Sequence, residues 1–188
     1  MRFYATIIVL LAAACSPIRP AWPLACDLVP TDTGASRITG CAVRDASGAI
    51  SVRQGAVAPE RFGPEGVGAI RIEGRLYFVN RKGKTAPAFF FDNGADYFVE
   101  GLARTVRHGK VGFVNVDLSE VVPAQWDFAY PFDRGFTKVC IGCVSKRVGD
   151  EHSVTAGGKW GCIDRTGRVV VPVVYDQDAV AAPSTNRR

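Results

Sequence analysis

One stretch near the C-terminus decides the fold: Gly158-Lys159-Trp160-Gly161-Cys162-Ile163-Asp164-Arg165-Thr166-Gly167-Arg168-Val169-Val170-Val171-Pro172. The residues on either side of its centre are rich in β-branched and aromatic side chains, which favour strands. The centre, Asp164-Arg165-Thr166-Gly167, has the residue types of a tight turn. The stretch therefore predicts two antiparallel strands joined by a short turn.

The same landmarks recur upstream in the same order. They are a Gly-basic pair, an Asn or Asp that begins a polar turn, and an aromatic-Asp pair: Gly74-Arg75, Asn80 and Phe91-Asp92; Gly109-Lys110, Asn115 and Trp126-Asp127; Gly158-Lys159, Asp164 and Tyr175-Asp176. Successive Gly-basic pairs are 35 and 49 residues apart, and successive aromatic-Asp pairs have the same two spacings. Two independent markers that keep the same spacing indicate an internal repeat.

A single hairpin is marginally stable in water, so we expect neighbouring repeats to stack and bury one face. The aromatic residues at repeat positions are expected to form that stacked core: Phe91, Trp126, Phe132, Trp160 and Tyr175. Because an Asp follows the aromatic residue in every copy, we expect each of these carboxylates to accept backbone N–H groups in its own turn.

The last interval is 14 residues longer than the one before it, at 49 against 35. A Phe-x-x-Gly motif occurs at residues 98–101 and again, 34 residues later, at 132–135. The excess therefore lies after Gly135, between Cys140 and Gly157. Insertions in repeat arrays project from the stacked core, commonly on the face that meets a partner. Upstream, the turn at residues 45–48 lies 35 residues before the one that ends in Gly83, which predicts a degenerate first copy over residues 41–67.

The stretch 158–172 resembles the WG (KWG) β-repeat, and residues 98–103 resemble the second half of that repeat. The resemblance covers roughly residues 40–176, with the signature residues Lys159, Trp160, Gly161, Asp164 and Gly167. It implies an all-β array of about three to four antiparallel β-hairpin repeats, often found in exported bacterial proteins, with no common activity or cofactor. The two middle copies diverge, because Leu76 and Val111 replace the signature Trp and Tyr77 replaces its Gly.

The N-terminus has the pattern of an export signal over residues 1–14, with Arg2 followed by an apolar run and three alanines. Cys15 after these alanines resembles the lipid-modified cysteine of a bacterial lipobox. We therefore expect an outer-membrane or periplasmic lipoprotein that contacts the membrane only through this lipid anchor. The alternatives are cleavage at the alanines or near Ala25, giving a soluble periplasmic or secreted protein, and a cytoplasmic chain. Residues 15–39 are expected to be an extended tether, 40–176 the repeat domain and 177–188 a disordered tail.

Export implies an oxidising compartment, so the cysteines are disulfide candidates first. We expect bonds between Cys26 and Cys41 and between Cys140 and Cys143, which leaves Cys162 unpaired. An alternative is that Cys140 and Cys143 exchange disulfides, which requires a helix N-terminus or a cation to lower a thiol pKa. A second alternative is a metal site in which His152 and Cys162 join the two cysteines.

Charge and motif content narrow the functional classes. The formal net charge is +5, but Arg2, Arg19, Arg187 and Arg188 account for four of these charges, which leaves a nearly neutral body. A neutral body gives no long-range basic field, so nucleic acid is not expected as a partner. The chain has only two His residues and neither a phosphate-loop nor a nucleophile-elbow motif. We therefore expect a non-enzymatic scaffold or interaction module without metal or cofactor. Its expected partner is an envelope protein. A hydrolase that uses Asp92, Asp127 and Asp176 is a weaker reading.

Overall fold

The computed structural model describes residues 22–28, 36–148 and 152–181 of the chain. The regular structure in these ranges is antiparallel β-sheet, apart from two short 3-10 helices, η1 (Pro59–Arg61) and η2 (Gln177–Ala179). The all-β prediction is therefore confirmed. The described ranges contain no helix long and apolar enough to span a membrane.

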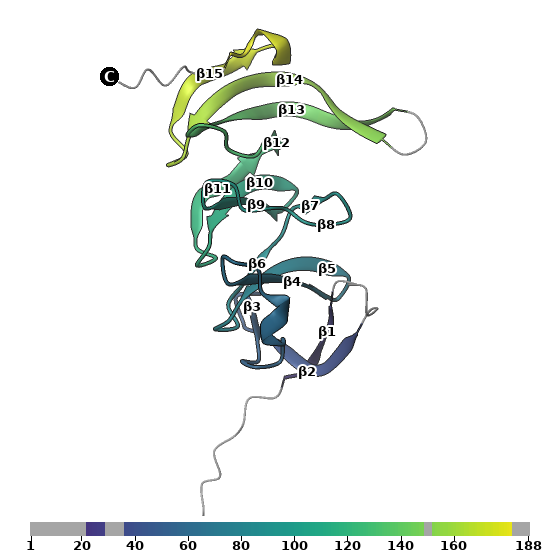
Figure 1. Cartoon of the computed structure of the whole chain (residues 1–188). Helices are drawn as coiled ribbons and strands as arrows, with labels where there is room; N and C mark the ends of the chain where they lie inside the picture. The colour runs from purple at the N-terminus through teal and green to yellow at the C-terminus, as the bar shows by residue number, and fades with distance from the viewer. Residues whose placement is uncertain (1–21, 29–35, 149–151, 182–188) are drawn as a thin grey trace, which may run out of the picture.

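The described residues form four copies of a three-stranded meander (Figure 1). The strands of the four repeats are, in chain order, β1 (Leu24–Leu28), β2 (Arg37–Arg44) and β3 (Ile50–Val52); β4 (Val67–Ile72), β5 (Arg75–Asn80) and β6 (Thr85–Pro87); β9 (Leu102–Arg107), β10 (Lys110–Asn115) and β11 (Glu120–Trp126); β13 (Phe136–Val148), β14 (His152–Asp164) and β15 (Val169–Tyr175). Three short strands lie between repeats: β7 (Phe90–Phe91) and β8 (Gly94–Ala95) form a small hairpin, and β12 (Phe128–Ala129) pairs with β13.

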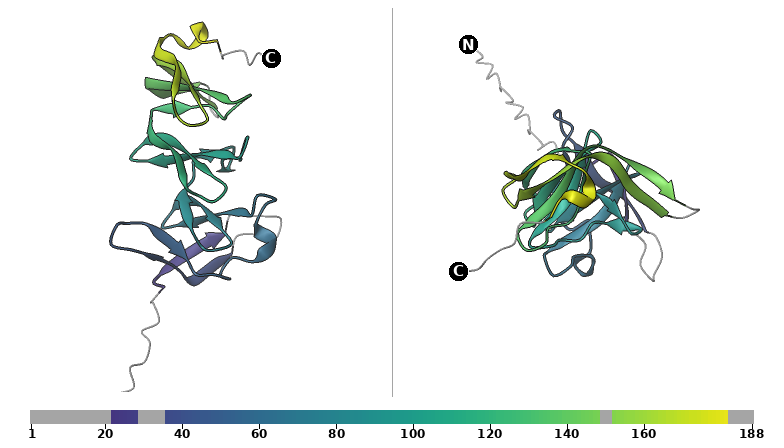
Figure 2. Two further views of the ribbon diagram at one scale, coloured as in Figure 1. Left: turned by 90° about the vertical axis from the view of Figure 1, so that its left-hand side faces the viewer. Right: turned by 90° about the horizontal axis from the view of Figure 1, so that it is seen from above.

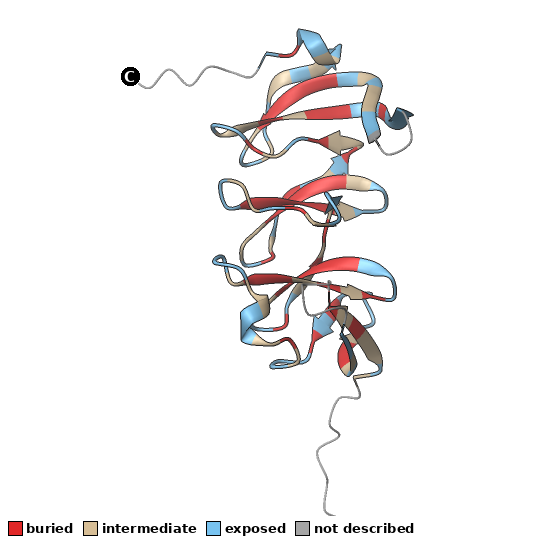
Figure 3. Cartoon of the chain, turned by 45° about the vertical axis from the view of Figure 1, so that its right-hand side comes forward, coloured by how far each residue is buried: buried red, intermediate tan, exposed pale blue. Residues whose placement is uncertain are grey.

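The repeats stack along one axis, with the N-terminal repeat at one end and the C-terminal repeat at the other (Figures 1 and 2). The first two repeats share one six-stranded sheet, because β1 pairs with both β2 and β4. The third repeat forms its own sheet, and the fourth adds β12 to make a sheet of four strands. The buried side chains lie within the first two repeats, between the successive sheets, and in a smaller cluster where Val180 packs on the fourth repeat (Figure 3).

The turn between the second and third strands is the same in every repeat. It begins with Asp45, Asn80, Asn115 or Asp164, spaced by 35, 35 and 49 residues. In each turn the side-chain Oδ1 accepts a hydrogen bond from the backbone N–H four residues later, at 3.0, 3.1, 2.9 and 3.1 Å. A carboxylate or amide oxygen at this position replaces a backbone partner within the turn, which explains why only Asp and Asn occupy it.

Residues 35 apart in the sequence touch across neighbouring repeats. The Thr85 hydroxyl donates to the Ile50 carbonyl at 2.6 Å, and Lys84 Nζ contacts Ser119 Oγ at 2.8 Å. The Gly135 N–H donates to the Glu100 carboxylate at 3.0 Å. Equivalent positions therefore lie above one another, as a stacked repeat requires.

The repeat domain begins earlier than the predicted boundary at residue 40. Strand β1 lies inside the six-stranded sheet, and Cys26 is fully buried there, so residues 24–28 are not part of a tether. At the other end, η2 follows the last strand and Val180 is buried against the fourth repeat, inside the predicted tail. In both places a few apolar residues pack on a sheet despite polar or Pro-rich neighbours. The predicted signal peptide, residues 1–14, and Cys15 lie outside the described residues.

Candidate functional site

The most prominent feature of the surface is a two-stranded arm in the fourth repeat. Strands β13 and β14 pair from Phe136 with Asp164 to Val148 with His152, with one interruption at Gly142 and Gly158. The neighbouring strands β12 and β15 pair only with the inner parts of this hairpin, so residues 143–148 and 152–157 extend beyond the sheet. Figures 1 and 2 show this arm projecting from the stack. The 14 extra residues located in the sequence therefore lengthen a hairpin.

The two faces of the arm differ in chemistry. The cross-strand pairs place Val144, Val148, Val154, Ala156 and Lys146 on one face, hereafter the valine face. The three valines are 65%, 50% and 46% exposed, which leaves their apolar surface uncovered by the described chain. The opposite face is polar and consists of Ser145, Arg147, Ser153 and Thr155. The arm therefore gathers its exposed valines on one face, and apolar residues gathered on one face are a feature of surfaces that bind another chain.

Glycines allow the arm to leave the sheet. Gly142, Gly157 and Gly158 have φ values of +78°, +72° and +71°, in the left-handed region that L side chains rarely adopt. A Cβ on Gly158 would lie 2.4 Å from the Cys143 nitrogen, so this position also has no space for a side chain. The bend at the base of the arm therefore depends on these residues.

A disulfide closes the base of the arm. Cys140 and Cys143 are bonded, with 6.1 Å between their Cα atoms, and both side chains are buried against Trp160 and Val180. Asp127 supports the same base, because its Oδ2 accepts the Gly142 N–H at 2.7 Å. The base of the arm is thus held both covalently and by a contact from the preceding repeat.

The other cysteines occupy the places expected from the sequence. Cys26 and Cys41 form a disulfide that joins β1 to β2. Cys162 carries a free and fully buried thiol. Burial raises the pKa of the Cys162 thiol, against a smaller opposite effect of Lys138. This thiol is therefore protonated at neutral pH and is a weak nucleophile.

The structure brings Cys140 and Cys143 together but does not bring His152 to them, as the alternative metal site requires. His152 pairs with Val148 at the outer end of the arm, whereas Cys143 pairs with Gly157 at its base. Five residues of extended strand separate these positions by about 16 Å. The His152 side chain lies outside the described part of the chain, and the described residues contain no group of three His, Cys, Asp or Glu suited to a metal. The cysteine pair lies in a strand and is buried, without the helix N-terminus that lowers a thiol pKa.

The three aspartates of the alternative hydrolase reading lie in different repeats. Asp127 pairs with Lys110, and Asp176 pairs with Lys159 at 2.9 Å. Lys110 and then the Gly142 N–H lower the pKa of the Asp127 carboxyl below its ordinary value. The prediction that each Asp serves its own turn is wrong for Asp127, because it accepts a hydrogen bond from the next repeat. Asp92 lies at the turn between β7 and β8, with a φ of +43°.

Two of the five predicted core aromatics are exposed. Trp126, Phe132 and Trp160 are buried, as expected, but Phe91 and Tyr175 lie at the surface. Phe91 belongs to the β7–β8 hairpin, where Phe90, Phe91 and Tyr97 are 56%, 46% and 61% exposed. We call these three residues the aromatic hairpin. Figure 1 shows it projecting on the same side of the stack as the arm.

A buried ion pair holds the aromatic hairpin in place. The Arg104 guanidinium donates from Nε and Nη2 to the Asp96 carboxylate at 2.9 and 2.7 Å, and both side chains are buried. Its third donor, Nη1, reaches the Ala129 carbonyl at 3.1 Å, and the guanidinium lies over the Phe89 ring at 4.2 Å. This pair was not predicted from the sequence, although a single Arg inside the apolar strand at residues 102–106 is an available signal.

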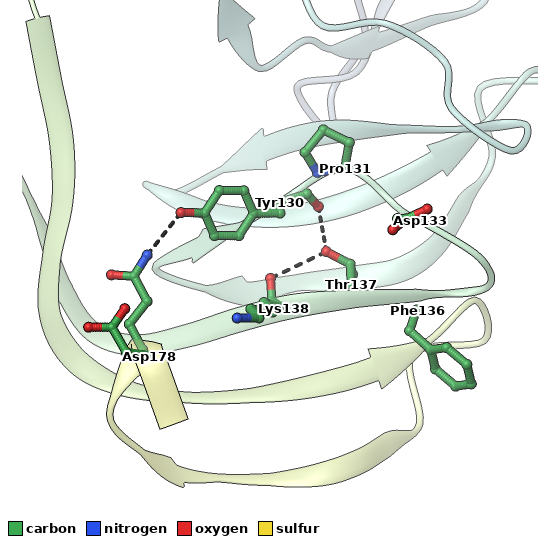
Figure 4. A pocket seen from close by; sticks show the side chains of 8 residues that line it. Tyr130, Pro131, Asp133, Phe136, Thr137, Lys138 and Asp178 are labelled. Atoms are coloured by element: carbon green, nitrogen blue, oxygen red, sulfur yellow. Dashed lines mark hydrogen bonds between the residues drawn. The ribbon is translucent and has the colours of Figure 1, made fainter. Parts of the chain in front are cut away.

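A pocket of about 330 Å³ lies on the fourth repeat, away from the arm (Figure 4). Its walls are Tyr130, Pro131, Asp133, Phe136, Thr137, Lys138, Gln177 and Asp178. Two of its polar groups are used within the wall: Gln177 Nε2 donates to the Tyr130 hydroxyl at 2.9 Å, and the Thr137 hydroxyl donates to the Tyr130 carbonyl at 2.6 Å. The lining residues include neither a histidine nor a thiol, so they offer no nucleophile with an adjacent imidazole base.

Comparison with known families decides the identity of the repeats. A family model described as "WG containing repeat" matches residues 112–142 and 160–177. The chain is a WG-repeat protein. The first match runs from β10 to the start of the arm, and the second begins at Trp160. No curated protein and no solved structure matches the chain.

The WG signature has a physical reason in this structure. Trp160 is fully buried, and its indole N–H donates to the Gly157 carbonyl at 2.9 Å. A Cβ on Gly161 would lie 2.4 Å from the Val171 carbonyl oxygen, so only glycine lets the third strand approach. Gly112 has the equivalent place in the third WG repeat, where a Cβ would lie 2.5 Å from the Val122 carbonyl oxygen. Lys159 pairs with Asp176, and Asp164 orders the following turn.

Proposed function

We propose that this WG-repeat chain is a non-catalytic interaction module of the bacterial cell envelope, and that its arm binds a partner protein. The observation that carries the proposal is the valine face. Val144, Val148 and Val154 are about half or more exposed on a strand pair that extends beyond the folded stack. Exposed apolar residues gathered on one face mark protein interaction sites more often than isolated ones do.

The arm also has the backbone features of a binding edge. Within the described residues, β13 beyond Gly142 and β14 before Gly157 pair only with each other, so no further strand covers the outer edge of either one. Such an edge is a template for a further strand. The disulfide and the Asp127 contact fix the base of the arm, which reduces the conformational entropy lost on binding.

The envelope location rests on the N-terminal sequence and on the cysteines. Residues 1–14 have the pattern of an export signal, and Cys15 follows three alanines. Two disulfides in one chain fit an oxidising compartment. We propose lipidation at Cys15, which would place the stack at a membrane surface. Mass spectrometry of the mature native chain tests this: an N-terminal lipidated Cys15 is expected, and an unmodified Cys15 or another first residue would contradict it.

Site-specific photo-cross-linking tests the arm as the binding surface. A photoreactive phenylalanine analogue is placed at Val144 or Val154 on the valine face, and at Ser145 or Ser153 on the polar face, in the full chain in its native cells. These four positions lie at similar distances along the same arm, so the polar-face variants are matched controls. We expect one discrete adduct from the valine-face positions only. No adduct, or equal adducts from both faces, would refute the proposal.

A further inference from the structure

We infer that the partner contributes an extended segment, with apolar residues at every second position and a carboxylate among them, which adds to an edge of the arm as a further strand and directs these side chains to the side of the valine face and the aromatic hairpin. The inference rests on the proposed function and specifies its partner. Four observations support it: the direction of the valine face, the position of the aromatic hairpin, the free edges of the arm, and the charge on the valine face.

The valine face is turned to the side on which the third repeat lies. The disulfide requires Cys140 and Cys143 to point to the same side of the hairpin, although they are three residues apart. Gly142, with its φ of +78°, shifts the alternation between them. Val144 therefore points to the side opposite Cys140, which is also the side of Val139. Val139 packs in the core shared with strands of the third repeat.

The aromatic hairpin emerges between the second and third repeats, below the arm and on the same side of the stack (Figure 1). It is a rigid platform because the Arg104–Asp96 pair is buried directly behind it, and Phe91 contacts both Tyr97 and the Arg104 guanidinium. Rigid aromatic side chains bind apolar groups at low entropic cost. The valine face and the aromatic hairpin thus form two apolar surfaces on one side of the stack.

The free edges of the arm favour an extended occupant. A strand added to either edge receives main-chain hydrogen bonds and extends the sheet, so every second side chain lies on the valine face. Apolar residues at every second position would then lie beside the valines, on the side of the stack from which the aromatic hairpin projects. A partner helix would leave the edge N–H and C=O groups without main-chain partners.

The charge on the valine face specifies a carboxylate. Lys146 is exposed in the middle of this face, in a cross-strand pair with Val154. A cross-strand neighbour of opposite charge stabilises a pair of strands, and a neighbour of like charge destabilises it. A second copy that paired through the same face would bring another lysine to it, because the described residues of the face include no acid. The occupant is therefore an acidic and apolar segment of a different protein.

Two synthetic peptides test the inference with the full mature chain. Each is a capped nine-residue peptide of alternating Val and Thr, with Glu in place of the central Val in one and Lys in the other. Binding is followed by nuclear magnetic resonance shifts of the arm amides. We expect the Glu peptide to bind about fivefold more tightly than the Lys peptide, the size of one cross-strand charge pair. Lys146→Glu should reverse this preference, whereas Lys82→Glu, on an exposed turn of the second repeat, should leave it unchanged.

The aromatic platform is tested separately by Tyr97→Ser, which removes an exposed ring and leaves the Arg104–Asp96 pair in place. It should weaken binding of the Glu peptide and leave the melting temperature unchanged. An absence of charge preference, or an equal effect of Lys82→Glu, would overturn the inference. If photo-cross-links still form only from Val144 and Val154 in that case, the proposed function stands and only the acidic partner segment is wrong. If neither experiment gives the expected result, both are wrong.

Discussion

Two buried tryptophans of this WG-repeat protein differ in the hydrogen bonding of their indole N–H groups, and this difference gives a quantitative prediction. Trp160 donates to the Gly157 carbonyl at 2.9 Å, whereas Trp126 Nε1 is buried without a partner in the described structure. Replacing either residue by Phe removes a similar amount of buried ring, so the loss of packing is largely common to both variants. The difference between the two variants therefore reports on the N–H groups.

Trp160→Phe loses a hydrogen bond worth about 1 kcal/mol, the one that its indole N–H donates to the carbonyl of the exposed residue Gly157. Trp126→Phe instead removes an unpaired buried donor, whose burial costs about 1–3 kcal/mol. We expect Trp160→Phe to lower the free energy of unfolding by about 2 kcal/mol more than Trp126→Phe does. Urea unfolding of the oxidised chain, followed by circular dichroism in the β-sheet region, measures the difference. An equal loss, or a larger loss for Trp126→Phe, would refute the reasoning.

Three further predictions concern the turns, the signature glycine and the buried ion pair. The pKa of the Asp164 carboxyl is lowered from its ordinary value of 3.8 to about 2, chiefly by the hydrogen bond from the Thr166 hydroxyl. The ionised carboxylate therefore stabilises the folded chain fully above pH 3.8, and this stabilisation is lost as the pH falls toward 2. Asp164→Asn, which copies the turns at Asn80 and Asn115, should therefore flatten the fall in melting temperature between pH 4 and pH 2, and an unchanged slope would contradict this. Gly161→Ala should lower the melting temperature, because the new Cβ would lie 2.4 Å from the Val171 carbonyl oxygen. Gly94→Ala is the control and should leave the melting temperature unchanged, because the space around Gly94 is open. Equal effects of the two substitutions would exclude the close approach as the cause. Arg104→Met should cost about 3–5 kcal/mol in urea unfolding, because it leaves Asp96 buried and unpaired, and Arg104→Met with Asp96→Leu should recover most of this loss. No recovery in the double variant would show that the cost lies elsewhere.

The repeats were predictable because each copy carries its own turn signal. Asp or Asn at residues 45, 80, 115 and 164 sets a local hydrogen bond, and local turns are visible in a single sequence. The position of the arm followed from the 14 extra residues by the same comparison. The amphipathic character of the arm could not be predicted in this way, because the bend at Gly142 and Gly158 decides which side chains of the outer strands share a face.

The features that the sequence did not predict depend on contacts between repeats. Strand β1 is five residues long and owes its place to β2 and β4 on either side. Asp127 serves a turn in the next repeat, which equal spacing alone does not indicate. Phe91 is exposed although it shares a register position with the buried Trp126, because β7 and β8 form a separate hairpin that does not join the stacked sheets.

The central claim, that the arm binds the partner, is tested most directly by shortening the arm. Residues 145–155 are replaced by Asn-Gly, a two-residue hairpin turn, so that Val144 and Ala156 remain paired and the disulfide is kept. The β signal and the melting temperature of the shortened chain should match those of the wild type, since the arm packs on no core cluster. Recovery of the partner from envelope extract with the shortened and the full-length chain is then compared. We predict that the partner cross-linked at Val144 is lost from the shortened chain, and its full recovery by that folded variant would contradict the account.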